Sequence, residues 1–162
     1  MALTRLNNSS LSSVTSAGLP TLASANMPTG SVLQVLSAST TASIFTTSTS
    51  FVSSGLSQAI TPSSTSSKIL CVVSVPSWYI GGNQSWITIY RGNTDIGTAT
   101  YGIMQIQASA SYAPATGQIL DSPSSTSAQT YTVYFRTSSG DTTYISHSSY
   151  GYLSLTLMEI AG

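Results

Sequence analysis

A single histidine is the first residue of this sequence that could serve acid–base chemistry. His147 could accept a proton from a serine while Asp121 or Asp141 orients its ring, as in a Ser-His-Asp triad. The chain holds 34 Ser and 23 Thr among 162 residues, so a serine close to the histidine carries no information. The Gly-x-Ser-x-Gly pattern of a nucleophile elbow is absent. We therefore predict no catalytic residues and a protein that is not an enzyme.

The four acidic residues also give little support to glycosidase chemistry, which needs two carboxylates around the scissile bond. Asp95, Asp121, Asp141 and Glu159 lie far apart in the sequence. Asp95 and Asp141 stand among turn residues, where a solvated cap is the usual role. Glu159 falls on the leucine side of the last predicted strand. Either that strand leaves the core there or the carboxylate is paired.

Ligands for a transition metal are scarce, since one His and one Cys cannot build a zinc site within one chain. We expect no metal site and no cofactor. Calcium held by an Asp and backbone carbonyls around a threefold axis is the alternative that the sequence leaves open. Cys71 lies in an apolar run and is interpreted as a small buried hydrophobe. As the lone cysteine it cannot form an internal disulfide, which agrees with a reducing compartment.

The charge pattern excludes two further classes of partner. Only 5% of the residues are charged, the formal net charge is zero, and Arg5, Lys68, Arg91 and Arg136 are scattered singly. Nucleic-acid binding needs clustered cations, so we expect no nucleic-acid partner. No apolar run reaches the roughly 18 residues of a membrane span, and we expect no membrane insertion. Residues 1–14 do not resemble a signal peptide, which favours a protein made in the cytoplasm.

The chain divides into two parts by its pattern. Residues 1–30 are punctuated by Gly and Pro and hold too few apolar residues for a regular face, which predicts an extended N-terminal arm. Residues 31–162 show short apolar or alternating runs between turn residues, as antiparallel strands do. We predict strands at Val32–Ala38, Ile44–Phe51 continuing to Ile60, Ile69–Val75, Trp86–Arg91, Tyr101–Ala108, Gln118–Asp121, Tyr131–Thr137, Thr142–His147 and Tyr152–Ile160.

The final strand has the clearest alternation, with Leu153, Leu155 and Leu157 on one side. The run Ile69–Val75 is apolar on both sides, which indicates a central strand or an outer face that meets another subunit. Ser138-Ser139-Gly140-Asp141 is predicted to close a hairpin between the strands on either side of it.

These patterns predict an all-β fold, a single antiparallel β-sandwich of the jelly-roll kind with an extended arm. The chain lacks the edge lysines and the large net charge that keep sheet proteins apart. Association is therefore expected, and a homotrimer covers several sheet edges at once.

Several stretches resemble a known family. Residues 1–11 and Ala17-Gly18-Leu19-Pro20 resemble the N-terminal arm of small fibre-like virion proteins of tailed phages, especially those of cyanobacteria. Residues 30–35, 60–70, 120–123 and 155–160 resemble landmarks of the attached head, which is similar to the trimeric C1q or tumour-necrosis-factor jelly roll. The resemblance spans nearly the whole chain, except residues 76–85 and 109–117. It implies an arm that anchors the protein through Leu3, Leu6, Leu11, Leu19 and Pro20.

Aromatic side chains in predicted loops are the candidate contacts to a receptor or to another subunit, because rings give a large contact area at low entropic cost. These candidates are Trp78, Tyr79, Tyr112, Tyr150 and Tyr152. The alternative is that Trp78 and Tyr79 cap the sandwich or pack between subunits. Trp86, inside a predicted strand, is expected in the core.

The sequence thus predicts a bacteriophage virion structural protein, assembled in the host cytoplasm and bound to other virion proteins. It would be a trimeric tail-fibre or adhesion-knob component that presents loops to a host surface glycan or protein. The alternative is a capsid decoration (cement) or head-fibre protein that stabilises the shell. A cell-wall-degrading enzyme is a third class, and it would need a cleft with a perturbed carboxylate pair.

Overall fold

The computed structural model describes residues 27–162, except residues 83, 108–110 and 150. Within this part of the chain every regular element is a β-strand, and no helix could cross a membrane. The strands are β1 (Val32–Thr40), β2 (Ile44–Thr46), β3 (Val52–Ile60), β4 (Lys68–Ile80), β5 (Gln84–Arg91), β6 (Thr94–Asp95), β7 (Met104–Gln107), β8 (Ser111–Asp121), β9 (Gln129–Thr137), β10 (Thr143–Ser146) and β11 (Leu153–Ile160).

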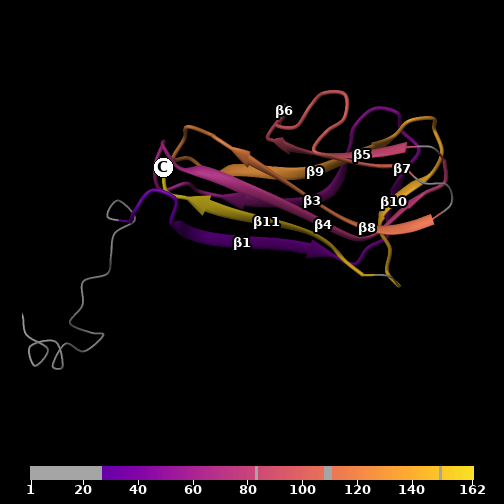
Figure 1. Cartoon of the computed structure of the whole chain (residues 1–162), viewed down its shortest axis with the longest axis horizontal. Coiled ribbons are helices and arrows are strands. Elements are labelled where there is room, and N and C mark those ends of the chain that lie inside the picture. The colour runs from indigo at the N-terminus through magenta and orange to yellow at the C-terminus, as the bar shows by residue number, and fades with distance from the viewer. Residues whose placement is uncertain (1–26, 83, 108–110, 150) are drawn as a thin grey trace, which may run out of the picture.

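The strands form two antiparallel sheets that pack face to face (Figure 1). One is six-stranded with the order β1-β11-β4-β10-β2, and β8 pairs with the other side of β4. The second is five-stranded with the order β3-β9-β5-β6, and β7 also pairs with β5. The predicted all-β antiparallel sandwich is confirmed. The first described residues lie beside the C-terminus, where the Gly30 amide donates to the Ala161 carbonyl at 2.8 Å.

The core lies between the sheets and is lined by alternate residues of β4, β5, β9 and β11. Leu153, Leu155 and Leu157 are fully buried, so the alternation predicted for the last strand is confirmed. Cys71 is buried as expected, and its burial raises the pKa of its thiol to about 12. The strand apolar on both sides, β4, is central, because it lies between β11 and β8.

Glu159 continues the inward side of β11 and is 1% exposed. Its carboxylate accepts hydrogen bonds from Gln34 Nε2 at 2.6 Å and from the Ser63 amide and hydroxyl, both at 2.7 Å. Of the two predicted alternatives, the strand stays in the core and the carboxylate is paired, with neutral donors in place of a cation. Burial alone would raise the pKa of Glu159, but these hydrogen bonds outweigh it and leave the pKa below its ordinary value.

Two predicted connections are wrong. The strand expected from Ile44 to Ile60 is divided into β2 and β3, which belong to different sheets. Between them the Ser48 hydroxyl donates to the Ser50 carbonyl and accepts from the Ser50 amide, which turns the backbone. The hairpin expected across Ser138–Asp141 does not form, since β9 and β10 also lie in different sheets. The same types of turn residue occur in a hairpin and in a connection between two sheets, so the sequence of this turn does not distinguish them.

An ion pair joins the two sheets at the end where the chain terminates. Arg91 Nη1 of β5 lies 2.6 Å from Asp121 Oδ2 of β8, and the Tyr131 hydroxyl of β9 donates to the same oxygen at 2.7 Å. Asp121 precedes Ser122 and Pro123, a pattern that favours a turn-organising role, but its carboxylate joins the two sheets. The pKa of Tyr131 is raised by its burial and by the bond to Asp121.

Glu159→Gln tests the neutral-donor arrangement around this carboxylate. The amide cannot accept all three bonds and turns an N–H toward a donor, so we expect a loss of about 1–3 kcal/mol at neutral pH. Because the folded pKa lies below the ordinary value of 4.5, the wild type loses this stabilisation as the pH falls through the folded pKa. Urea unfolding at several pH values should show the gap between the two proteins narrowing in acid. Asp141→Asn, on an exposed carboxylate, is the control, and a gap independent of pH would contradict the account.

Candidate functional site: the uncharged face of the six-stranded sheet

A register shift in β4 decides which aromatic side chains face outward. Between Val75 and Trp78 the pairing with β8 shifts, at the point where Pro76 has no amide hydrogen to donate. Before the shift the odd-numbered residues face the core, and after it Trp78 and Ile80 do. Tyr79 is thereby turned to the outer face of the sheet, on the same side as Leu70 and Val72.

The prediction of Trp78 as a surface contact is wrong, and Trp78 and Tyr79, expected in a loop, lie in a strand. The strand continues to Ile80, and Trp78 is fully buried, as the alternative of a residue capping the sandwich implied. Its indole nitrogen lies 3.2 Å from the hydroxyls of both Ser85 on β5 and Thr143 on β10. Trp78 therefore connects the two sheets at the end far from the ion pair.

Four aromatic side chains form one row across the outer face. Strand pairing places Tyr112 of β8 opposite Tyr79 of β4, Tyr79 opposite Tyr144 of β10, and Tyr144 opposite Phe45 of β2. The successive ring centroids are 4.8, 5.9 and 5.3 Å apart. His147 extends the row, with its ring 6.2 Å from that of Tyr144. Such offset contacts between rings are favourable and hold the row in place.

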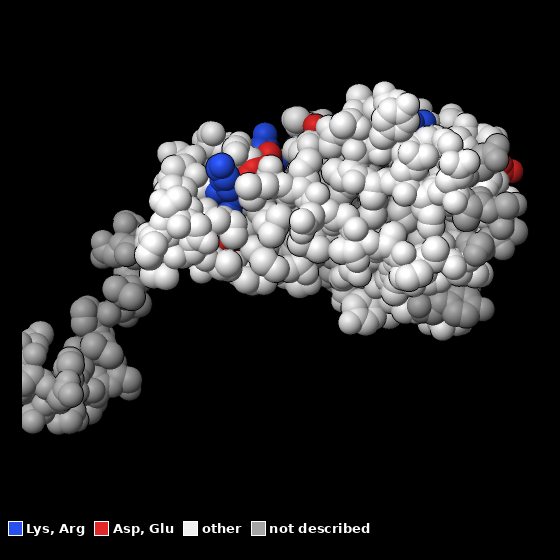
Figure 2. Space-filling view, viewed as in Figure 1, with Lys and Arg blue, Asp and Glu red and all other residues white. Residues whose placement is uncertain are grey.

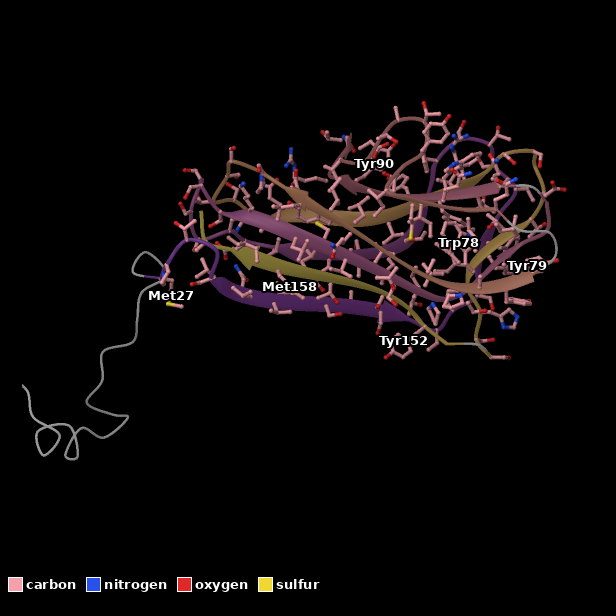
Figure 3. All side chains as sticks on the ribbon, in the orientation of Figure 1. Met27, Trp78, Tyr79, Tyr90, Tyr152 and Met158 are labelled. Carbon is pink, nitrogen blue, oxygen red and sulfur yellow. The ribbon has the colours of Figure 1, made fainter. Side chains whose placement is uncertain are left out.

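An aliphatic row crosses the other end of the same face, where Val35, Met158, Leu70 and Leu120 are cross-strand partners on β1, β11, β4 and β8. Between the two ends lie mainly hydroxyl side chains. Their cross-strand rows are Ser37, Thr156, Val72 and Gln118, then Ser39, Ser154, Ser74 and Thr116. Figure 3 labels Met158, Tyr152 and Tyr79 in turn along this side of the sandwich.

None of the side chains in these rows is charged. Seven large hydrophobic side chains are exposed in the described part of the chain, and five of them lie on this face. These five are Val35, Phe45, Tyr112, Leu120 and Tyr152, each between 48% and 59% exposed. In Figure 2 the lower side of the molecule, along most of β1, shows no blue or red atoms. An apolar, uncharged surface of this extent is typical of a face that another protein covers.

Three of the five predicted contact residues come together on this face. Tyr79 and Tyr112 are neighbours in the aromatic row, and Tyr152 lies beside Ser74, Pro76 and Ser154 around a hollow of about 260 Å³. Tyr150 and the predicted anchoring residues lie outside the described residues; the latter are Leu3, Leu6, Leu11, Leu19 and Pro20. Sequence reasoning missed Phe45 and Tyr144, although each alternates with core residues inside a predicted strand.

The candidate acid–base groups are dispersed. Asp121 pairs with Arg91, Asp141 accepts a hydrogen bond from Ser139, and His147 Nδ1 accepts one from the Ser149 amide. The described residues contain no group of three or more His, Cys, Asp or Glu side chains that could hold a metal. Trp86 is buried as expected, but it lies on the outer side of β5 under Arg136.

The geometry of this face suits association better than catalysis, because it is a broad surface of rings, aliphatic groups and hydroxyls. Hydroxyls can pair among themselves, as those of Ser37 and Thr156 do at 3.1 Å. No protein-family model matches the chain, and no curated protein matches it.

Proposed function

We propose that this chain is a non-enzymatic structural protein of a bacteriophage virion, a tail-fibre or adhesion-knob component whose head assembles as a homotrimer. The observation that carries the proposal is the uncharged face of the six-stranded sheet. Covering five half-exposed hydrophobic side chains per copy releases water from rows of side chains that carry no charge to desolvate, since Lys68 lies beyond them at the rim of the face. A second copy of the same chain offers the matching surface.

The arrangement of the sheets favours a ring of three copies over a dimer in which two copies pack sheet face against sheet face. The strand orders β1-β11-β4-β8 and β3-β9-β5-β6 support the jelly-roll topology that we propose. The sequence of β1, at one edge of the six-stranded sheet, contains no Lys, Pro or charged residue to discourage pairing. In a ring, the β1 edge of one copy packs against the outer face of the six-stranded sheet of the next copy, so both the edge and the face are covered. In a dimer that packs face against face, the β1 edges stay exposed.

The arm gives the head its place on the particle. Met27, the first described residue, lies at the end of the sandwich where the chain terminates, far from Tyr79 of the aromatic row (Figure 3). An arm that leaves from this end can bind the virion while the opposite end and the second sheet point outward. The resemblance to phage fibre arms supports Leu3, Leu6 and Leu11 as anchoring residues.

A capsid decoration protein is the second candidate, favoured by one observation. Strand β1 begins at Val32, directly after the predicted arm, so no shaft separates the arm from the head. Copy number on purified particles separates the two functions. Tens of copies or fewer, on the tail, support the fibre, and hundreds over the shell support decoration.

Val72→Glu tests self-association. Val72 is half-buried at the centre of the uncharged face, and an unpaired carboxylate there would be desolvated on assembly. We expect the trimer to dissociate, with at least about a tenfold weaker association and unchanged strand content by circular dichroism. Thr132→Glu, half-buried on the outer side of the other sheet, is the matched control and should stay trimeric. Trimers of both variants, or a wild-type monomer in sedimentation equilibrium, would refute the proposed interface.

Deleting residues 1–26 tests the anchor. The deletion leaves the contact between Gly30 and Ala161 in place, so the head should fold and assemble with an unchanged melting temperature. Particles produced by a phage that carries the truncated gene should lack the protein. Normal incorporation of the truncated head would show that the arm is not the anchor.

A further inference from the structure

A second surface lies on the opposite side of the sandwich, over the five-stranded sheet. A pocket of about 430 Å³ opens there between residues 49–51 and residues 99–100, with Tyr90 and Arg136 among its lining residues. Figure 3 labels Tyr90 on the side of the molecule away from Tyr152. Assembly through the uncharged face would leave this pocket in solvent.

Arg136 holds the two walls of the pocket together. Its Nη1 donates to the Thr49 carbonyl at 3.0 Å and its Nη2 donates to the Thr100 carbonyl at 2.5 Å. The guanidinium carbon lies 4.2 Å from the Trp86 ring centroid and 5.1 Å from that of Phe51. The cation is thus fixed in position before any ligand arrives, which lowers the entropic cost of binding.

Among the residues that the structure describes, the Arg136 guanidinium has no counterion. Within the described residues no carboxylate lies within 4.0 Å of Arg136, and its two hydrogen-bond acceptors are neutral carbonyls. Its Nε and the Trp86 Nε1 are buried donors without a hydrogen-bond partner in that part of the chain. A guanidinium has five N–H donors, so each Nη keeps one N–H beyond its bond to a carbonyl. A half-buried cation with spare donors favours an anionic ligand, and a carboxylate matches its planar fork.

The rest of the lining suits a sugar ring. Tyr90 stacks on Tyr134 with centroids 4.1 Å apart and an angle of 28° between the rings, so its orientation is set by a neighbour. Three hydroxyl-bearing residues, Thr49, Ser50 and Thr100, also line the pocket. Aromatic surface beside hydroxyls and one fixed charge is the usual composition of a small-ligand site.

We propose that this pocket binds a uronic-acid-type saccharide unit, with the sugar ring against Tyr90 and the carboxylate on the free Nη donors of Arg136. The proposal deepens the attachment function proposed above by naming the class of host-surface glycan that the head would take. Its chemistry does not depend on the oligomeric state, so the two proposals can fail separately.

The test titrates the full chain with trigalacturonic acid and with its methyl ester, which has the same rings but no charge. Isothermal calorimetry gives the affinity, and tryptophan fluorescence reports on Trp86 beneath the guanidinium. We expect saturable binding of the acid, at least about tenfold weaker binding of the ester, and weaker binding of the acid at higher ionic strength.

Ala99→Trp should block the pocket without touching Arg136 and lower the affinity for the acid at least about tenfold. Ala128→Trp, on an exposed alanine before β9, is the matched control and should bind as the wild type does. Arg136→Gln keeps a donor for the loop carbonyls but removes the charge, so the variant should bind the acid and the ester with equal affinity. Ala99→Trp remains informative even if this second variant does not fold.

Three results would overturn the proposal. Equal affinity of the wild type for acid and ester would remove the role of Arg136 as the carboxylate site. Unchanged binding by Ala99→Trp would place the sugar elsewhere. Absence of binding at up to about 10 mM of the acid, by protein that sediments as a trimer, would refute the pocket while leaving the assembly proposal intact.

Discussion

The register shift in β4 between Val75 and Trp78 is the constraint on which the aromatic row and the Trp78 link between the two sheets depend. A regular strand would place Trp78 on the outer face and Tyr79 in the core. With the shift, the indole reaches Ser85 and Thr143 and connects the sheets, while Tyr79 becomes the second ring of a row across four strands. Pro76 makes the shift inexpensive, because a proline has no ladder hydrogen bond to lose.

The scarcity of charge shapes the interior as well as the surface. Glu159 is held by an amide and a serine in place of a cation, and Trp78 by two hydroxyls. Hydroxyl groups meet these needs because each can donate and accept, and they add little bulk to a sandwich core. The ion pair of Arg91 with Asp121 is at the rim, where partial solvation lowers the cost of burying charge.

The sequence could predict features that depend on one strand at a time. The alternation of Leu153, Leu155 and Leu157 identifies a core-facing strand whatever its neighbours are, and the two apolar sides of β4 identify a central one. The orientation of Trp78 could not be predicted, since it depends on the pairing of β4 with β8. The aromatic row could not be predicted for the same reason. Its members come from four strands, and the registers between those strands place the rings side by side. Ser138–Asp141 failed as a hairpin signal because local turn chemistry does not specify which sheet the chain enters next.

The outer faces of the two sheets differ in how they place the few charged side chains of this protein. The central rows on the outer face of the six-stranded sheet carry none, and Lys68 lies at the rim of that face, at the start of β4, so the exposed hydrophobic groups can be covered without desolvating an ion. The five-stranded sheet places one cation, Arg136, between rings and backbone carbonyls, where a low local dielectric strengthens its attraction for an anion. In a protein with few charges, an isolated cation meets little competing attraction from its own chain. Neutral rows of side chains on one sheet and a fixed cation on the other would thus let one small sandwich assemble through the first sheet and recognise a ligand through the second.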